Sequence, residues 1–326
     1  MPDHPVKIWY VAGQRLCNLK CPYCVSTGDW AKSNRYDWKN PADRDTFAAV
    51  VQWIASRPRP VEVRLGSLGE PFASTFFLEK AAWLTQQPGV RYVELLSNGS
   101  LIRQRLPKLE PLANLGKLSL WLTWHEGQLP LGRFLEGAVF AQEEYGCFIV
   151  VNTLLFDSRD TGGIQRVRDA ARAAGLRFNV DLGYDPSAPS ESSESSDHAG
   201  DPFRTVPAMR DADVVAAVNA CGGDPALTQA ALAGLSSPLG RPCRAGHDYL
   251  FIDIHGQVYR CSRYAALDRA PLGSVLDPGF ELPLRPELWA PCEAASSCCN
   301  KEDFLNLQLA APLRPRDVPS LGWTNA

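Results

Sequence analysis

Short apolar runs alternate with amphipathic stretches along the first 185 residues of this chain. The apolar runs are rich in β-branched and aromatic residues and predict six strands, at Val6–Ala12, Val61–Leu65, Arg91–Leu96, Leu118–Thr123, Cys147–Leu155 and Arg177–Leu182. The stretches between them predict helices, at Pro41–Ala55, Ser74–Gln86, Leu101–Leu115, Arg133–Tyr145 and Ile164–Ala174. This alternation predicts an α/β fold with a parallel sheet and helices outside it, and six units are too few to close an eight-fold barrel.

Local signals mark where some of these helices begin and end. Asn40 followed by Pro41 is typical of an N-cap and the first residue of a helix. Pro107 and Pro111 both fall within the predicted helix Leu101–Leu115. Because proline lacks a backbone N–H, we expect these two residues to break that helix into short pieces.

The pattern changes after residue 185. Residues 186–201 are dominated by Ser, Glu, Pro and Gly and predict a flexible connector. Helical stretches follow at Asp211–Ala220 and Pro225–Leu235, and Ile252–Tyr259 predicts a β-hairpin with a tight turn at His255-Gly256. We therefore divide the chain into a barrel over 1–185, a linker and helical insert over 186–242, and a small domain with a tail over 243–326.

Composition and charge exclude several classes of function. The chain has 326 residues, of which 45% are hydrophobic and 21% charged, as in ordinary globular proteins. Its net charge of -3 gives no general attraction to nucleic acid. No run approaches the roughly 18 apolar residues that a membrane span needs, and the polar first residues do not form a signal peptide. We expect a cytoplasmic protein with neither nucleic acid nor membrane as a partner.

The chain has ten cysteines, and in a reducing cytosol clustered cysteines bind metal more often than they form disulfides. Three of them form a C-x3-C-x2-C loop after the first predicted strand, and we call Cys17, Cys21 and Cys24 the front cysteines. This spacing differs from that of zinc sites and bacterial ferredoxins. Three thiolates on one loop can hold three corners of a cubane iron–sulfur cluster and leave one iron open for a ligand. Five more cysteines, which we call the back cysteines, are Cys243, Cys261, Cys292, Cys298 and Cys299.

The front cysteines resemble the signature of the radical S-adenosylmethionine (radical SAM) superfamily, in which an aromatic residue lies near the last cysteine. Tyr23 fills the aromatic place here. The resemblance implies a partial (β/α)6 barrel that is open on one side, which agrees with the strand and helix alternation. It also implies that the front cysteines hold a [4Fe–4S] cluster, and that SAM binds the open iron through its amino and carboxylate groups.

Two further turns resemble motifs of this superfamily. The sequence G-S-L-G-E-P after the second predicted strand resembles its GGEP motif, in which backbone and acidic side chain meet the amino group of SAM. Only Gly69, Glu70 and Pro71 match that motif directly. The sequence S-N-G after the third strand resembles the TNG ending, so Ser97 and Asn98 are expected to reach the cofactor. Each sequence is by itself also typical of a plain turn.

The fourth predicted strand ends in W-L-T-W-H-E, which gathers aromatic and titratable groups at the same edge of the sheet. The resemblance implies that this strand end contacts the carboxylate or ribose of SAM, so Thr123 and, on the fifth strand, Asn152 are candidate cofactor contacts. His125 and Glu126 are candidate catalytic groups, although a histidine here is also typical of an ordinary core or surface position. Further candidates of the same kind at the sixth strand end are Asp181 and Asp185.

The back cysteines resemble the start of the SPASM and twitch domains, which carry auxiliary clusters behind many radical SAM barrels. Cys243 and Cys261 bracket the predicted hairpin as C-x12-G-x4-C, and L-G-S-V at 272–275 resembles the turn that follows. The full SPASM pattern is absent, because only Cys292 and Cys298 have the expected spacing and Cys299 is adjacent. The resemblance implies a shortened twitch-like domain with one auxiliary [4Fe–4S] cluster, held by the first three back cysteines and one of the last two. A structural zinc site is the alternative.

We expect different roles for the remaining two cysteines. Cys147 starts the fifth predicted strand on the face opposite the cofactor, so we expect a buried structural thiol. Cys221 lies near a Gly-Gly break in the insert and is a candidate hydrogen-atom donor, although a lone cysteine is more often inert.

Together the resemblances imply an enzyme that generates a 5′-deoxyadenosyl radical and removes a hydrogen atom from its substrate. Oxidation would use the auxiliary cluster as electron acceptor, whereas epimerisation would use a thiol donor. A small-molecule natural-product intermediate, aminoglycoside- or sugar-like, is the first expectation, because the cysteine motif begins near residue 1 and leaves no room for a leading peptide-recognition domain. A reducing partner such as flavodoxin or ferredoxin is also expected.

Two alternatives to this function stay open. One is a radical SAM maturase that cross-links, epimerises or oxidises a ribosomal peptide or a protein side chain. The other is a non-catalytic iron–sulfur or zinc scaffold, against which the six-unit barrel and the G-E-P sequence argue. Fold and cofactor do not identify the substrate.

Overall fold

The six predicted strands form one curved parallel sheet. The computed structural model describes residues 5–24, 37–38, 40–159, 161–185, 206–207, 214–223, 238–266, 268–294 and 306–308. The barrel strands lie in sequence order, as β1 (Val6–Ala12), β2 (Val61–Ser67), β3 (Val90–Ser97), β4 (Leu118–Thr123), β5 (Phe148–Leu155) and β6 (Arg177–Leu182). The predicted fold class, a partial (β/α)6 barrel, is confirmed.

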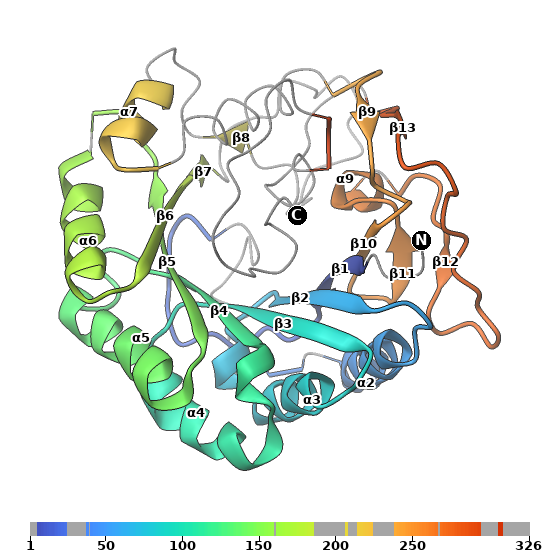
Figure 1. Ribbon diagram of the computed structural model, residues 1–326, viewed down its shortest axis with the longest axis horizontal. Coiled ribbons are helices and arrows are strands. Elements are labelled where there is room, and N and C mark those ends of the chain that lie inside the picture. The colour runs from blue at the N-terminus through green and yellow to red at the C-terminus, as the bar shows by residue number, and fades with distance from the viewer. Residues whose placement is uncertain are drawn as a thin grey trace.

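Helices lie along the outer face of this sheet (Figure 1). They are α2 (Pro41–Ala55), α3 (Thr75–Thr85), α4 (Ile102–Leu109), α5 (Leu131–Tyr145) and α6 (Thr161–Ala173), with short 3-10 turns η1 (Pro71–Ala73), η2 (Glu110–Leu112) and η3 (Leu115–Lys117). Each helix returns the chain to the start of the next strand. The carboxyl ends of the strands therefore meet at one edge of the sheet, which is where parallel α/β folds carry their chemistry.

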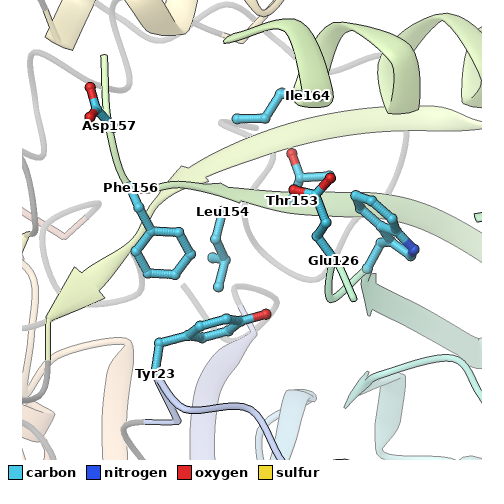
Figure 2. A pocket seen from close by; sticks show the side chains of 9 residues that line it. Tyr23, Glu126, Thr153, Leu154, Phe156, Asp157 and Ile164 are labelled. Carbon is cyan, nitrogen blue, oxygen red and sulfur yellow. The ribbon is translucent and has the colours of Figure 1, made fainter. Parts of the chain in front are cut away.

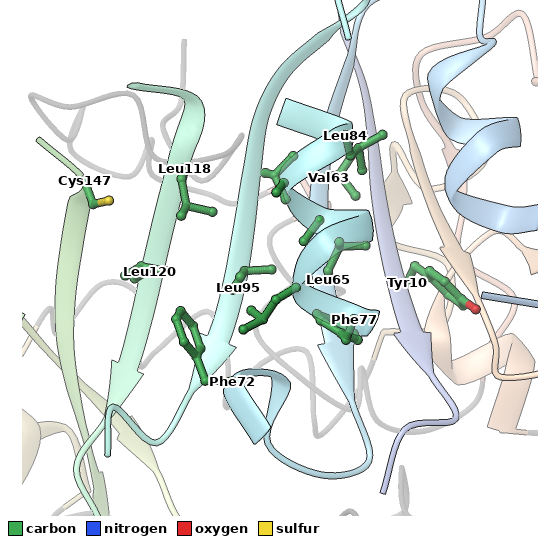
Figure 3. Close-up of a cluster of buried hydrophobic side chains, with 14 of the residues drawn as sticks. Tyr10, Val63, Leu65, Phe72, Phe77, Leu84, Leu95, Leu118, Leu120 and Cys147 are labelled. Carbon is green, nitrogen blue, oxygen red and sulfur yellow. The ribbon is translucent and has the colours of Figure 1, made fainter. Parts of the chain in front are cut away.

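The space between sheet and helices is filled by apolar side chains (Figure 3). Tyr10, Leu65 and Leu95 enter it from strands, and Phe72 and Phe77 enter it from η1 and α3. All five side chains are fully buried. Burial of a large apolar side chain contributes about 1.5–3 kcal/mol, so this layer holds the ends of β2 and β3 firmly in place.

The other face of the sheet carries polar groups into the barrel interior. Because side chains alternate between the two faces of a strand, Arg64, Glu94 and Ser119 point away from the helices. Arg64 and Glu94 are cross-strand partners and form a buried ion pair of 2.7 Å, and the Ser119 hydroxyl donates to Glu94 at 3.3 Å. A buried charge is costly unless it is paired, so this group favours the observed register of β2, β3 and β4.

The predicted start of α2 is confirmed. Asn40 has extended backbone angles, its side-chain oxygen accepts the N–H of Ala42 at 3.1 Å, and Pro41 is the first residue of the helix. The Asn40 side chain thus satisfies one of the N–H groups that a helix start leaves without an intrahelical partner.

The predicted helix Leu101–Leu115 is divided into short pieces as expected, but the break lies at Pro111 and not at Pro107. Helix α4 runs through Pro107 and ends at Leu109, and Pro111 falls in η2 directly after it. Pro107 is exposed and lies near the end of the helix. The carbonyl of Arg103, four residues earlier, loses its helical partner, and on the exposed side of a short helix water can replace that bond.

A hairpin from the last third of the chain continues the barrel sheet. Strands β10 (Tyr249–Ile252) and β11 (Gln257–Tyr259) pair antiparallel, with Gly256 in the turn at φ 77°, as predicted. Strand β10 also pairs in parallel with β1, and β12 (Gly273–Ser274) pairs with β11. The sheet therefore has nine strands in the order β12-β11-β10-β1-β2-β3-β4-β5-β6. Backbone hydrogen bonds join the region after residue 243 to the barrel.

Smaller elements complete the described structure. They are β7 (Tyr184–Asp185), which pairs with β8 (Val206–Pro207), β9 (Pro242–Cys243), which pairs with β13 (Ala290–Pro291), and the helices α7 (Val214–Ala220) and α9 (Ser262–Ala266). The predicted connector over 186–201 and the predicted helix Pro225–Leu235 lie outside the described residues. None of the helices in the described ranges is long and apolar enough to cross a membrane.

Candidate active site

The front cysteines lie on the loop that follows β1, at the carboxyl edge of the sheet. The N–H of Cys24 donates to the carbonyl of Cys21 at 3.2 Å and turns the loop. Cys21 is buried, whereas Cys17 and Cys24 are half-buried. Burial, followed by neighbouring acidic groups that include the other front thiols, raises the pKa of Cys17 to about 12 and that of Cys21 to about 11. Cysteines bind metal as thiolates, so we expect metal binding here to release protons.

The donor set of this loop is three thiols. Within the described ranges, no three Cys, His, Asp or Glu side chains form a group that could hold one metal ion. Three soft sulfur ligands on one loop fit three corners of a [4Fe–4S] cluster.

The turn after β2 packs directly on the cysteine loop. The N–H of Glu70 donates to the carbonyl of Leu16 at 2.8 Å. A Cβ at Gly69 would collide with that carbonyl oxygen and lie 2.5 Å from the carbonyl carbon of Arg15. Only glycine permits this approach of two backbones. Pro71 follows as the buried first residue of η1.

Both oxygens of the Glu70 carboxylate accept hydrogen bonds from protein groups. Glu70 is 2% exposed and accepts hydrogen bonds from the N–H of Phe72 at 2.9 Å, the hydroxyl of Ser97 at 2.7 Å and the N–H of Asn98 at 2.7 Å. Burial raises its pKa, and these three bonds act in the opposite direction. The resemblance predicts this carboxylate at the amino group of SAM, whereas here it ties the end of β2 to the end of β3.

The end of β4 meets the cysteine loop through Tyr23. The Tyr23 hydroxyl lies 3.1 Å from Nδ1 of His125, and the two rings stack 5.8 Å apart. Burial lowers the pKa of His125 to about 4 and raises that of Tyr23 well above its usual value. The imidazole is therefore neutral at pH 7, and a hydrogen bond joins it to the phenol. Glu126 lies at the rim, with its side chain 63% exposed and 3.9 Å from Arg166.

A cavity of about 300 Å³ opens beside Tyr23 (Figure 2). Its walls combine apolar and aromatic groups with two carboxylates, and the lining residues are Tyr23, Trp124, Glu126, Thr153, Leu154, Phe156, Asp157, Gly163 and Ile164. The rings of Tyr23 and Phe156 lie 4.8 Å apart. The Thr153 hydroxyl oxygen is buried and has no hydrogen-bond partner within the described part of the chain. A flat, largely apolar ligand with one polar edge fits such walls.

A row of polar side chains crosses β4, β5 and β6 in the barrel interior. The Asn152 amide donates to the Thr123 hydroxyl at 3.2 Å, and the Asn179 amide donates to Asn152 at 2.8 Å and to Asp181 at 2.9 Å. Asn152 and Asn179 are buried. The structure thus brings together the three predicted residues Thr123, Asn152 and Asp181 and adds Asn179. Asn179 lies two residues before Asp181 and therefore on the same face of the strand, which was the available sequence signal. The side chain of Asp185 lies outside the described part of the structure.

Three back cysteines come together in a second buried cluster. Cys243, Cys261 and Cys292 share it with Trp9 and Phe251, whose rings lie 5.0 Å apart. Strand β9 carries the first of these cysteines, and its partner β13 ends just before the third. Trp9 projects from the interior face of β1, so the three thiols belong to the barrel-interior side of the sheet. Outside the described residues lie Cys298 and Cys299.

Two arginines flank these three back cysteines. Arg285 donates to the carbonyl of Cys243 at 2.8 Å. The guanidinium of Arg260 lies 5.0 Å from the ring centroid of Tyr264. Burial alone would lower the pKa of Arg260, but Tyr264 and the three described back cysteines raise it overall. Arg260 therefore places a positive charge next to these thiols, and its position directly before Cys261 was a sequence signal for that role.

Cys221 is placed away from the candidate site, and the expectation that its thiol reaches the substrate needs correction. It is fully buried in an apolar cluster with Leu155, Ile164 and Val218, between the outer face of the sheet and helices α6 and α7. A thiol packed there cannot face the barrel interior without opening that layer. Cys147 lies in the main core, as predicted for a structural thiol, and burial raises its pKa to about 12.

Sequence reasoning missed two further residues of the site. Asn18 lies between the first two front cysteines and accepts a hydrogen bond from Asn98 at 3.2 Å. Phe156 follows β5 directly and forms a wall of the cavity. A polar residue inside the cysteine loop and an aromatic residue at a strand end were the available signals.

Comparisons with known proteins match this chain through its fold. No model of a protein family matches the chain, and no curated protein matches it in sequence. The crystal structure of Streptococcus suis SuiB bound to S-adenosylmethionine aligns with a TM-score of 0.55 at 14% identity, over 88% of this chain and 67% of that chain. Native anSMEcpe with bound AdoMet and the Kp18Cys peptide aligns with a TM-score of 0.54 at 17% identity, over 83% of this chain and 78% of that chain. The fold of this chain is thus the partial barrel of radical SAM enzymes.

Proposed function

We propose that this protein is a radical SAM enzyme whose front cysteines hold a [4Fe–4S] cluster at the carboxyl edge of the barrel. One observation carries the proposal. The cysteine loop, the G-E-P turn and the S-N-G turn, which lie far apart in sequence, are bonded to one another beside a cavity of about 300 Å³. A scaffold that only stores a metal has no need of this cavity.

The donor set supports the cofactors that the fold implies. Cys17, Cys21 and Cys24 would hold three irons of the cluster and leave the fourth open to SAM. When bound, these cofactors supply the reductive cleavage of SAM to methionine and a 5′-deoxyadenosyl radical, which removes a hydrogen atom from the substrate. We further propose flavodoxin or ferredoxin as the source of the electron.

The cavity beside Tyr23 supports a place for the adenine end of SAM. Tyr23, Leu154, Phe156 and Ile164 offer apolar and aromatic surfaces to a flat ring, and the Thr153 hydroxyl offers a hydrogen bond that no described residue takes up. His125, neutral at pH 7, holds Tyr23 through a hydrogen bond between Nδ1 and the Tyr23 hydroxyl. Its low pKa supports a positioning role over general acid catalysis.

The placement of the cysteines supports oxidation over epimerisation. Cys243, Cys261 and Cys292 lie on the barrel-interior side, where an auxiliary [4Fe–4S] cluster, completed by Cys298 or Cys299, would be available to accept an electron. Cys221, the candidate hydrogen-atom donor, is packed behind the sheet. The candidate electron acceptor therefore lies on the same side of the sheet as a substrate radical in the barrel, and the thiol of Cys221 lies on the other side.

The polar row in the barrel interior supports a hydroxyl-bearing small molecule as substrate, such as an aminoglycoside- or sugar-like intermediate. Thr123, Asn152, Asn179 and Asp181 present amide, hydroxyl and carboxylate groups held in place by one another. Such groups bind hydroxyl and amino groups through directional hydrogen bonds.

A second candidate is the modification of a peptide or a protein side chain. It is favoured by one comparison, because anSMEcpe with its bound Kp18Cys peptide shares the fold at a TM-score of 0.54. Product analysis by mass spectrometry after incubation with aminoglycoside-type alcohols and with cysteine- or serine-containing peptides would separate the two substrate classes.

The proposed function is tested by anaerobic assay of the reconstituted protein. Wild type should bind about eight irons, the count for two cubanes, and should form 5′-deoxyadenosine from SAM with dithionite. A Cys17/Cys21/Cys24→Ala triple variant should lose about four irons and form no 5′-deoxyadenosine. Cys221→Ala is the matched control, because it removes a buried thiol outside both clusters and should leave SAM cleavage intact.

The opposite result would support the scaffold alternative. Bound zinc in place of iron, together with no SAM cleavage by the wild type, would contradict the radical mechanism. Equal SAM cleavage by the wild type and the triple variant would separate that activity from the front cysteines and would contradict the site assignment.

A further inference from the structure

The turn at the end of β3 has little freedom to move. Gly99 has φ 73°, and a Cβ there would come within 2.7 Å of the Phe134 ring, so the position requires glycine. The N–H of Gly99 donates to the Ser97 hydroxyl at 3.0 Å, and that hydroxyl donates to Glu70 at 2.7 Å. The residue between them, Asn98, is therefore fixed from both sides.

The backbone of Asn98 is also held directly by Glu70. Its N–H donates to Oε2 of that carboxylate at 2.7 Å. Hydrogen bonds to a charged carboxylate are stronger than those between neutral groups, and Glu70 is itself fully enclosed by protein. Asn98 is 7% exposed, so its side chain is presented in one direction only.

The hydrogen bonds around the Asn98 amide determine which end faces the cysteine loop. The N–H of Ser100 approaches one end at 3.0 Å, and because a backbone N–H only donates, that end must be the oxygen. The nitrogen consequently faces the loop. It lies 3.9 Å from the sulfur of Cys17 and 3.2 Å from the side-chain oxygen of Asn18.

We infer that Asn98 is a positioning residue that tunes the reduction potential of the front cluster through an N–H to sulfur hydrogen bond on Cys17. The inference rests on the proposed function. Reduction adds negative charge to a cluster and its sulfur ligands, so a hydrogen bond donated to sulfur stabilises the reduced state more than the oxidised state. Asn98 therefore raises the midpoint potential and makes the electron transfer that precedes SAM cleavage easier.

Glu70 and Ser97 have a defined part in this arrangement. They hold the turn that carries Asn98 and do not touch the sulfur themselves. The acidic residue of the G-E-P turn thus acts on the cluster through its neighbour, which is a different role from contact with the SAM amino group.

The test is an anaerobic redox titration of the whole, cluster-loaded protein, followed by electron paramagnetic resonance (EPR). The front cluster is identified as the signal that changes when SAM is added, and a signal from the back cysteines serves as an internal reference. Asn98→Ala and Asn98→Ser both remove the amide donor. Ser100→Ala is the control for the surrounding network, because it removes the hydroxyl that bonds the Asn98 oxygen and accepts from the Asn18 amide at 2.8 Å, while the Asn98 nitrogen and the Ser100 N–H stay in place.

Both Asn98 variants should shift the midpoint of the SAM-responsive signal to a more negative potential. A tenfold change in the one-electron equilibrium corresponds to about 59 mV, and a shift of about that size is expected. Ser100→Ala should match wild type, and the reference signal should not move in any variant. SAM affinity, measured by isothermal titration, should be similar in all four proteins.

Several outcomes would overturn the inference. An unchanged midpoint in either Asn98 variant would show that the hydrogen bond does not tune the cluster. Loss of front-cluster iron from both Asn98 variants would assign the residue to holding the loop instead. A wild-type protein with no SAM-responsive signal would be a different failure, because it would contradict the proposed function itself.

Discussion

The two cysteine groups of this protein differ in their surroundings, although the first follows β1 and the second lies around the hairpin that pairs with β1. The front cysteines are on a loop, two of them half-buried, with a polar network of Glu70, Ser97 and Asn98 behind them and a cavity beside them. The described back cysteines are all buried among aromatic side chains, and Arg260 and Arg285 flank them.

This difference indicates what each group is suited for. Partial exposure next to a cavity allows a ligand to reach a metal at the front loop. Burial of all described members in an apolar cluster favours a centre that exchanges electrons and binds no substrate. Pairing of β10 with β1 joins the hairpin that precedes Cys261 to the strand that precedes the front loop.

The largest effects are expected from single cysteine substitutions, one in each group. Cys21→Ala should abolish 5′-deoxyadenosine formation, because it removes a buried ligand of the cluster that binds SAM. Cys261→Ala should lower the iron content by about four per chain while SAM cleavage continues and substrate oxidation is lost. Liquid chromatography of both products measures this split. SAM cleavage abolished equally by both substitutions would show that the two groups do not have separate roles.

Gly69→Ala should loosen the front loop without touching a cysteine. The new Cβ would collide with the backbone at Arg15 and Leu16, and such overpacking costs about 1–3 kcal/mol. Denaturant unfolding should show this loss together with reduced iron occupancy. Gly132→Ala is the control, because nothing lies within 4 Å of its added Cβ and a helical alanine changes stability by no more than about 1 kcal/mol in the favourable direction. Equal stability of the two variants would argue against the close approach.

Arg260→Gln tests the effect of a nearby positive charge on the back cysteines alone. Removal of a positive charge next to the described back cysteines should lower the potential of the auxiliary cluster by an amount on the order of tens of millivolts, and the front signal should stay in place. EPR-monitored titration resolves the two. A shift of the SAM-responsive signal instead would mean that Arg260 acts on the front loop.

His125→Gln should have the smallest effect, confined to acid pH. The folded imidazole has a pKa of about 4, below its ordinary value. Between that value and about 6.5, the unfolded chain binds a proton that the folded chain does not. Wild-type stability should therefore fall as pH falls through this window, by about 2 kcal/mol between pH 7.5 and pH 5. Urea titrations of the variant should lack this part of the pH dependence. Identical curves for both proteins would show that the pKa of His125 is the same in the folded and unfolded chain.

The sequence carried the local information about this fold well. Periodicity located the six barrel strands, and the Asn40-Pro41 pair located the start of α2, because these signals depend on neighbours in the chain. The pairing of β10 with β1 joins residues more than 200 positions apart, and no local pattern encodes it. The division of Leu101–Leu115 into short pieces was predicted, but Pro107 was not placed inside α4, because tolerance of proline depends on the exposure and length of the finished helix.

The candidate site was predictable by residue type but not by contact. The motifs named Glu70, Ser97 and Asn98, yet only the folded chain shows that the first holds the other two. Cys221 could not be placed from its spacing, since burial behind β5 and β6 is decided by the packing of α7. Asn179 and Phe156 were hidden for the same reason, as their roles arise from neighbouring strands.

The central claim is that an iron held by the front cysteines is open to SAM. The most direct measurement is the EPR spectrum of the reduced, reconstituted protein before and after addition of SAM. A change in the spectrum of the wild type that is missing from the Cys17/Cys21/Cys24→Ala variant is the predicted result. A cubane signal in the wild type that does not respond to SAM would contradict the account.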